Sequence, residues 1–507
     1  MTDPTPDRTR GILAFAGYVP RHRLERSAIA EASGTNAGQG ARSVASYDED
    51  TTTMGVEAAR LALRPLGDDG RMVPRSLWFS TTDPAYVDKT NATVVHAALR
   101  LDHEVAALDL NGSVRSAAGA LLAALRGCDP ILVVSSDTRT GLPTSADERE
   151  GGDAAAAVLV GQGDAARPVL AEVIAQVSVT EEFLDRWRTP GDRRSKQWEE
   201  RFGELHYVAL GTEAFKLALG QAGLDAADVA QVIVSGTHAR AVRQVAGKVG
   251  AGTGGVADDL SSAIGNPGAA QPALLLARAL EHAQPGQVLA LVVLADGADV
   301  VLLRATDALA SWTPSRAVDD QVADGHAGLR YLTFLSWKGM VTLEPPRRPE
   351  PARASASAAA RNQSWKFGFV GSRDHDTGAV HLPPARVSFQ GGAADHMDPL
   401  PMADARGTVV TYTVDRLAYS PSPPIVFAVI DFDAETGGGR LPMELTDVAA
   451  TDVAIGDRVE MTFRRLNQAD GVQNYFWKAK PVGPEKPVGP AKPVGPAKPA
   501  QPAKGER

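Results

Sequence analysis

The chain up to about residue 305 alternates short, uniformly apolar runs with longer runs rich in Ala and Leu. An apolar run without polar alternation is typical of a strand that is buried on both faces of a sheet. The strand candidates are 76–80, 105–110, 130–136, 154–160, 231–235 and 288–294. The helix candidates are 54–64, 91–101, 114–126, 208–223, 239–250 and 267–283. This alternation predicts βαβ units, and therefore an α/β fold with a mostly parallel sheet and helices outside it.

The succession of elements occurs twice along this part of the chain. One copy covers residues 10–165 and the other covers 166–305, and each ends in a pair of strands of hairpin type, such as 288–294 and 297–304. Two similar α/β halves indicate a pseudo-twofold duplication with a site between the halves. An ordinary doubly wound sheet explains the periodicity equally well.

The pattern changes after residue 305. Residues 306–361 carry a short aromatic patch and then a Pro-, Ala- and Arg-rich stretch, which predicts an extended linker. Residues 362–480 hold short strand-like runs with no long helical run, which predicts a small all-β barrel. These runs are 408–420, 424–434, 458–467 and 472–480. Residues 481–507 continue a Lys-Pro-Val-Gly-Pro repeat, which predicts an extended, disordered tail.

Composition narrows the class of protein. Hydrophobic residues make up 44% of the 507 positions and charged residues 22%, as in folded globular chains. The net charge of −9 disfavours a general nucleic-acid binder, which needs clustered Lys and Arg. Cys128 is the only cysteine, so no disulfide can form within the chain, which fits a reducing cytoplasm. The polar N-terminus and the absence of a long uncharged apolar run predict a cytoplasmic protein without membrane segments.

Four segments of the first 305 residues carry a resemblance to a known superfamily. They are VVSSDTRTG (133–141), GGDAAAAVLVG (151–161), VSGTHARAVRQVAGKVG (234–250) and IGNPGAAQPALLLARALEHAQPGQVLALVVLADGAD (264–299). In order and spacing they resemble the thiolase superfamily, closest to hydroxymethylglutaryl-CoA synthases and type III ketoacyl synthases. The resemblance implies a duplicated five-layer α/β fold. It also implies carbon–carbon bond chemistry on an acyl-CoA or acyl-carrier thioester.

Residues 362–480 resemble the OB-fold proteins that accompany thiolase-like enzymes, here fused in one chain. Those proteins usually carry a zinc ribbon, with two Cys-x-x-Cys pairs, ahead of the barrel. The corresponding positions here hold Asp374, Thr377, Ser388 and Gly391, which do not make a tetrahedral zinc site. We therefore expect a degenerate ribbon with no metal, and no cofactor other than CoA as part of the substrate. The barrel has aromatic residues but no strong basic stripe, so we expect no nucleic-acid partner.

The resemblance also implies two catalytic side chains. The family's histidine falls on His238 and its asparagine on Asn266, and both would donate hydrogen bonds to a thioester oxygen as it becomes an enolate. His238 follows an apolar strand and precedes a helix, a common place for site residues in α/β sheets. The competing interpretations are a capping histidine and a turn asparagine.

The family's cysteine nucleophile has no counterpart. An ungapped fit places Val114 at that position, and a slip of one residue would place Ser113 there as a serine nucleophile. Hydroxymethylglutaryl-CoA synthases also use a glutamate as general acid and base, and its position holds Thr82. Asp83 and Tyr86 lie close by in the chain and could move a proton, although each could equally be an ordinary loop residue.

These departures define the expected chemistry. Without a thiol no acyl-enzyme thioester forms, so reactions that need only an enolate remain: aldol addition, retro-aldol cleavage or decarboxylation. His238, Tyr86 and Asp83 are the candidates for the base. Two alternatives stay open, a catalytically degenerate scaffold that binds acyl-CoA and an acyltransferase that uses Ser113. The resemblance further implies a homodimer that pairs through the edge strand near 105–110.

Overall fold

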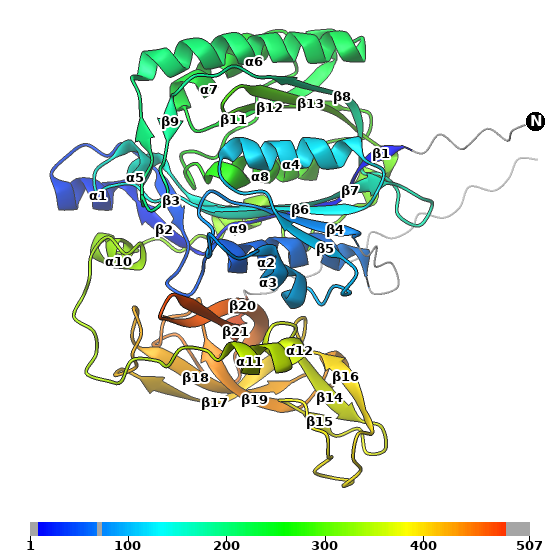
Figure 1. The fold of residues 1–507 in the computed structure, drawn as a ribbon, viewed down its shortest axis with the longest axis vertical. Coiled ribbons are helices and arrows are strands. Elements are labelled where there is room, and N and C mark those ends of the chain that lie inside the picture. The colour runs from blue at the N-terminus through cyan, green and yellow to red at the C-terminus, as the bar shows by residue number, and fades with distance from the viewer. Residues whose placement is uncertain (1–8, 68–73, 483–507) are drawn as a thin grey trace, which may run out of the picture.

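The computed structural model describes residues 9–67 and 74–482. Most of the tail predicted from residue 481 lies outside the described residues. The chain folds into a large α/β part and a smaller barrel that is packed against one side of it (Figure 1).

One nine-stranded sheet forms the centre of the α/β part, in the order β11-β12-β13-β8-β1-β7-β6-β4-β5. Its strands are β1 Arg10–Tyr18, β4 Ser76–Ser80, β5 Ala106–Asp109, β6 Ile131–Thr138, β7 Asp153–Gln162, β8 Ala171–Val179, β11 Val229–Gly236, β12 Val288–Leu294 and β13 Ala298–Ala305. Only the β11–β12, β4–β5 and β4–β6 pairs are parallel, and the others are antiparallel. The prediction of a mostly parallel sheet was wrong because an apolar run shows that a strand is buried but not which way it runs.

The duplication is visible in the strand order. In the first half the order is β4-β6-β7-β1, and in the second half the strands β11-β12-β13-β8 repeat it. The first half adds β5 as an edge strand. At the equivalent edge of the second half a single bridge joins Val232 to Val256. The prediction of a duplicated fold is confirmed, and the alternative of an ordinary doubly wound sheet is wrong.

Five layers follow from the way in which helices cover the two halves of the sheet (Figure 1). Helices α6 (Glu200–Ala222) and α7 (Ala239–Val249) lie on the outer face of the second half. Helices α4 (Val114–Arg126) and α8 (Gln271–His282) lie between the halves and bury Leu121, Leu125, Leu274 and Leu275 there. Helices α2 (Thr51–Leu63) and α3 (Ala92–Ala98) cover the outer face of the first half. This arrangement confirms the predicted five-layer fold.

The C-terminal part is a closed barrel in the order β17-β18-β19-β21-β20. Its strands are β17 Arg406–Asp415, β18 Ile425–Phe432, β19 Arg440–Leu445, β20 Arg458–Ala469 and β21 Val472–Pro481. A small sheet precedes it, formed by β14 Val370–Asp374, β15 Val380–His381 and β16 Met397–Pro401. Phe463, Tyr475 and Trp477 fill the barrel core with their rings in contact. The predicted barrel is confirmed, and β19 is the strand that the sequence pattern missed.

The connector 306–361 is not extended throughout. Short helices α9 (Val318–Ala323) and α10 (Tyr331–Trp337) pack on the α/β part and bury Val318 and Phe334. Lys338 follows them and forms an ion pair of 2.6 Å with the fully buried Asp153. The aromatic patch that the sequence placed in the connector therefore belongs to the α/β core, and an irregular stretch follows before α11 (Ala356–Arg361).

Helix α2 packs directly against the barrel. All of its residues from Thr51 to Ala62 are buried. Glu57 accepts a hydrogen bond of 3.1 Å from the backbone N–H of Phe463, and Arg60 lies 4.7 Å from the Trp477 ring centroid. The close packing of α2 against sheet and barrel fixes the position of the barrel relative to the α/β part.

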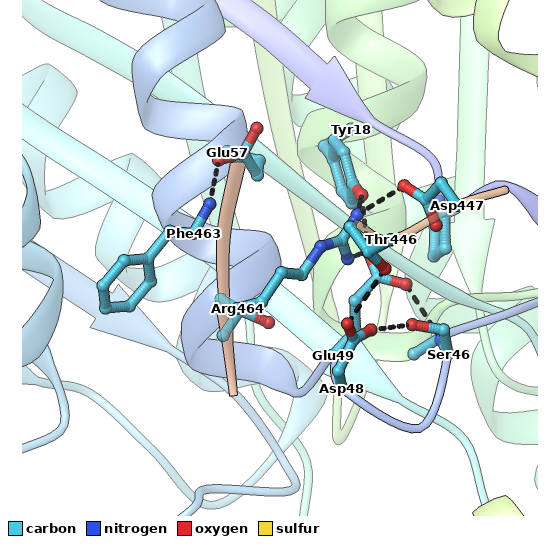
Figure 2. Close-up of polar contacts among 12 residues, drawn as sticks. Tyr18, Ser46, Asp48, Glu49, Glu57, Thr446, Asp447, Phe463 and Arg464 are labelled. Atoms are coloured by element: carbon cyan, nitrogen blue, oxygen red, sulfur yellow. Dashed lines mark hydrogen bonds and ion pairs between the residues drawn. The ribbon is translucent and has the colours of Figure 1, made fainter. Parts of the chain in front are cut away.

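Buried charges join the two parts beside this helix (Figure 2). Arg464 of β20 is 1% exposed and pairs with Glu49 and, at 2.6 Å, with Asp447. Lys478 of β21 is fully buried and lies 3.0 Å from Asp48. Burial acts to lower the pKa of Lys478, but the Asp48 carboxylate raises it above its usual range. Because Asp48 and Glu49 belong to the α/β part and both cations to the barrel, the two parts form one body.

Candidate active site

His238 stands at the start of α7, directly after β11, with both ring nitrogens bonded to backbone. Its Nδ1 accepts a hydrogen bond of 3.2 Å from the N–H of Ala241 in the first turn of α7. Its Nε2 lies 2.9 Å from the carbonyl oxygen of Glu200. A nitrogen that accepts from a backbone amide carries no proton, so Nε2 bears the hydrogen and is the donor. The helix terminus thereby sets the tautomer in which Nε2 donates.

Asn266 lies in the loop before α8, and both the oxygen and the nitrogen of its side-chain amide are hydrogen-bonded to backbone. Its Oδ1 accepts from the N–H of Gly268 at 2.8 Å, and its Nδ2 donates to the carbonyl oxygen of Gly236 at 2.7 Å. The backbone of Asn266 pairs with Glu150 and Gly152 of the other half. An asparagine amide carries two N–H groups, so one donor remains after the bond to Gly236.

One pocket of about 510 Å³ brings these two side chains together. It lies between the halves of the fold, as the duplication predicted, because the second half supplies His238 and Asn266 while the first half supplies Arg139, Asp147 and Gly151. Its other lining residues include Arg26, Arg149, Asp185, Arg186, Trp198, Arg243 and Gln271. The pocket therefore combines two fixed neutral donors with several charged groups.

Asp185 is a pocket residue that sequence reasoning missed. It is 6% exposed, and its carboxylate and the His238 imidazole both lie beside Gly203 of α6. A Cβ on Gly203 would be 2.2 Å from Asp185 Oδ1 and 3.0 Å from His238 Cδ2, so only glycine lets α6 approach both. Burial raises the pKa of Asp185, and the nearby His238 opposes that rise. No apolar periodicity marks this segment, so the sequence pattern offered no signal for it.

Asp137, near the end of β6, connects two loops beside the site through hydrogen bonds. Its fully buried carboxylate accepts bonds from the Thr82 hydroxyl at 2.8 Å and from the Ala269 N–H at 2.9 Å. Burial raises the pKa of Asp137. Since Thr82 occupies the position at which the resemblance expects a glutamate, Asp137 links that position to the loop that carries Asn266.

The other predicted site residues lie apart from the His238 pocket. The Tyr86 hydroxyl accepts a bond of 2.8 Å from the backbone N–H of Gln473, so it faces the barrel. Asp83 is exposed, and its carboxylate accepts a hydrogen bond from the Thr138 hydroxyl. Within the part of the chain that the structure describes, neither side chain lines the pocket.

Ser113 and Val114 form the start of α4. Ser113 is the residue that caps the helix, and its Oγ lies 3.5 Å from Ser116 Oγ. Val114 is the first helical residue and is 9% exposed. Among the residues described, neither lines the pocket that holds His238 and Asn266. Cys128 is exposed after the end of α4 and so stands away from this helix terminus.

The four positions of the zinc-ribbon pattern do come together in space. The Thr377 hydroxyl donates to Asp374 Oδ2 at 2.8 Å, and a Cβ on Gly391 would be 3.3 Å from the same oxygen. A hydrogen bond from Ser388 contributes most to lowering the pKa of Asp374 to about 2. One carboxylate, two hydroxyls and a glycine do not fit tetrahedral zinc, which takes Cys or His ligands in structural sites. Hydrogen bonds to Asp374 hold together the loops that zinc would otherwise join.

Comparison with known proteins supports both parts of the architecture. Residues 401–464 match the family described as ChsH2, C-terminal OB-fold domain. The hydroxymethylglutaryl-CoA synthase of Thermococcus gammatolerans is 26% identical over 304 residues, covering 58% of this chain and 85% of the relative. That of Aeropyrum pernix is 28% identical over 328 residues, covering 62% and 90%.

Solved structures show the same fold. PksG, a HMG-CoA synthase from Bacillus subtilis, matches with a TM-score of 0.55 and 16% identity over 66% of this chain and 89% of its own. A crystal structure of HMG-CoA synthase complexed with CoA matches with a TM-score of 0.54 and 16% identity, over 68% and 94%. The chain thus combines a thiolase-like fold with a fused OB-fold domain. None of the described helices is long and apolar enough to cross a membrane.

Proposed function

Starting from a thiolase-like fold fused to an OB-fold domain, we propose that this chain performs carbon–carbon bond chemistry on acyl-CoA thioesters through an enolate. The observation that carries the proposal is the pair of donors in one pocket, His238 Nε2–H and Asn266 Nδ2–H, each oriented by backbone bonds. Preoriented donors of this kind stabilise the oxygen that becomes negative as an enolate forms. The hydroxymethylglutaryl-CoA synthase relatives support a CoA thioester as the ligand.

In the retro-aldol direction, Asp185 is our candidate for the base. It takes the proton of the β-hydroxyl, the Cα–Cβ bond breaks, and the electron pair passes to the thioester oxygen as an enolate. The carbonyl fragment leaves, and the proton held by Asp185 returns to Cα. A raised pKa makes a carboxylate a stronger base near neutral pH, and Asp185 has one. The thioester oxygen takes the place of the Glu200 carbonyl oxygen as the acceptor of the His238 Nε2–H.

Two observations favour a non-catalytic acyl-CoA scaffold as the second candidate. The residue at the start of α4, Val114, has no nucleophilic group. Both ring nitrogens of His238 are hydrogen-bonded to backbone groups. A serine acyltransferase has less support, because the Ser113 hydroxyl faces Ser116 rather than the pocket.

Incubation with β-hydroxyacyl-, β-ketoacyl- and malonyl-CoA thioesters separates these functions. We expect mass spectrometry to find cleaved or decarboxylated thioester and unmodified protein. An acyl adduct on Ser113 would replace the enolate mechanism with acyl transfer. Binding without any product would leave the scaffold as the function.

We further propose that the chain forms a homodimer through β5, the predicted edge strand. Its Leu108 is 48% exposed, and its outer edge has no partner among the described strands. An unpaired edge favours association with another strand. Light scattering is expected to give twice the mass of one chain, and Leu108→Lys to return it to one. A wild-type protein that scatters as a single chain contradicts the dimer.

A further inference from the structure

Two short segments rich in histidine and aspartate face each other at one end of the small sheet that precedes the barrel. Residues 374–376, with the sequence Asp-His-Asp, continue from the end of β14, and residues 396–398, with the sequence His-Met-Asp, open β16. The two strands are antiparallel, and the N–H of His375 donates to the carbonyl oxygen of His396 at 3.2 Å. The pairing of these strands therefore gathers two imidazoles and three carboxylates.

The side chains of these residues contact one another. The rings of His375 and His396 meet edge to face, with their centroids 4.5 Å apart. His396 Nδ1 lies 3.1 Å from Asp376 Oδ2, and His375 Nε2 lies 2.7 Å from Asp398 Oδ1. One ligand atom from each of Asp374, Asp376 and His396 lies within 4.8 Å of the other two. Ligand atoms on one zinc-sized ion are about 3–4 Å apart, so small side-chain rotations would complete a metal site.

The carboxylates of this cluster face histidines rather than stronger cations. Asp376 and Asp398 form their ion pairs with the two imidazoles. The arginines near them in the sequence have other partners: Arg373 donates to the carbonyl oxygen of Gly437 at 2.7 Å, and Arg386 binds both oxygens of Asp395. A divalent cation would supply the positive charge that these arginines direct elsewhere.

We propose that this end of the small sheet binds one divalent transition-metal ion through Asp374, Asp376 and His396, with water at the remaining positions. An imidazole nitrogen beside carboxylate oxygens suits zinc, cobalt or nickel, whereas calcium and magnesium take oxygen ligands. The side chains of Asp376 and His396 are 61% and 50% exposed, so an ion reaches them from solvent. The bound ion joins the end of β14 to the start of β16.

This set differs from the four positions of the zinc-ribbon pattern and shares only Asp374 with them. Thr377, Ser388 and Gly391 offer no nitrogen or sulfur, and the facing strand supplies the nitrogen through His396. A carboxylate accepts about four hydrogen bonds or ligand contacts, so Asp374 can bind an ion while it keeps its bond to Thr377. The expectation of a metal-free ribbon applies to the four positions of the pattern. The small sheet lies far from the pocket between the halves (Figure 1), so this proposal is independent of the acyl-CoA function.

The test measures binding of the metal alone to the full chain. After dialysis against EDTA, the protein is titrated with Zn²⁺ by calorimetry and with Co²⁺ by visible absorption, which changes when protein ligands replace water. We expect one ion per chain in both titrations. Calcium and magnesium are the comparison ions, and they are expected to bind at least about 10-fold more weakly, because an imidazole is a poor ligand for them.

Two variants locate the ion, and a third serves as the control. His396→Gln and Asp376→Asn each remove one ligand and are expected to weaken zinc binding at least about 10-fold. His282→Gln is the matched control, since His282 forms an exposed pair of 2.8 Å with Asp319. That carboxylate also binds Arg278, so its charge is balanced, and the control is expected to leave the affinity unchanged. The three replaced side chains are exposed, and melting without metal is expected to match the wild type and to verify folding.

Each outcome decides the proposal. Zinc binding that His396→Gln and Asp376→Asn weaken, and that His282→Gln leaves unchanged, supports the site. Failure of both Zn²⁺ and Co²⁺ to bind up to about 1 mM, the range of weak affinity, overturns it. Zinc affinity that is the same in the wild type and all three variants places the ion elsewhere and also overturns it. Equal affinity for zinc and calcium removes the imidazole from the site, with the same consequence.

Discussion

Replacing His238 by asparagine is expected to lower enolate formation at least about 100-fold, as the loss of one preoriented oxyanion donor does in other enzymes. The rate is measured as exchange of the Cα protons of a bound acyl-CoA with D₂O, followed by NMR. This readout needs an enolate but no knowledge of the natural acyl chain. The wild-type protein is expected to exchange these protons, because the side chains of His238 and Asn266 line one pocket.

Asparagine is chosen because His238 also caps α7. Its Nδ1 accepts the Ala241 N–H, and loss of a helix cap costs about 1 kcal/mol. An asparagine oxygen retains the cap, so the melting temperature is expected to stay close to that of the wild type while exchange falls. Asp185→Asn serves as the parallel variant, because it removes the proposed base and leaves both donors in place. Exchange that survives in His238→Asn at the wild-type rate would exclude the oxyanion role of His238.

Replacing Arg464 by methionine is expected to destabilise the protein by about 3–5 kcal/mol, the usual cost of removing one partner from a buried ion pair. Arg464 is 1% exposed and neutralises Glu49, which is equally buried, and Asp447 (Figure 2). Methionine fills similar volume but leaves two carboxylates without a cation at the junction of barrel and α/β part. Urea unfolding measures the loss, and we expect the transition to begin at lower urea.

Arg440→Met is the matched control in the same barrel. Arg440 binds Asp431 through two hydrogen bonds, but its side chain is 65% exposed. An exposed pair of this kind contributes about 0–1 kcal/mol, so the control is expected to unfold close to the wild type. Equal shifts in Arg464→Met and Arg440→Met would mean that the buried network does not hold the barrel in place. If only Arg464→Met unfolds at clearly lower urea, the buried network is the joint between the barrel and the α/β part.

The strands and the duplicated halves could be predicted because their signal is local. A run such as 288–294 is apolar throughout, and the structure has β12 at Val288–Leu294 with every residue buried. The His238 and Asn266 segments were recognised through their resemblance to segments of the thiolase superfamily, and each of these segments is short and continuous in the chain. Their meeting in one pocket followed from the fold that the resemblance implied, and the comparisons support that fold.

The missed residues are charged side chains whose surroundings come from distant parts of the chain. In sequence, Asp185 and Arg139 read as solvated polar positions, because their burial depends on α6 and on the loop after Asn266. The same holds for Asp48, whose buried partner Lys478 lies in the barrel. Strand direction was also misjudged, since it depends on how the chain returns between strands.

The sequence by itself determined the two α/β halves and the barrel, because each is marked by patterns within short segments, and its resemblance to a known superfamily pointed to His238 and Asn266 as candidates. Only the tertiary structure decided which charges are buried together. Removing a charge from water is costly unless a partner offsets the lost hydration, and the partners of Arg464 and Lys478 are supplied by distant segments of the folded chain. The chemistry of the pocket wall and the joint with the barrel were therefore settled by packing.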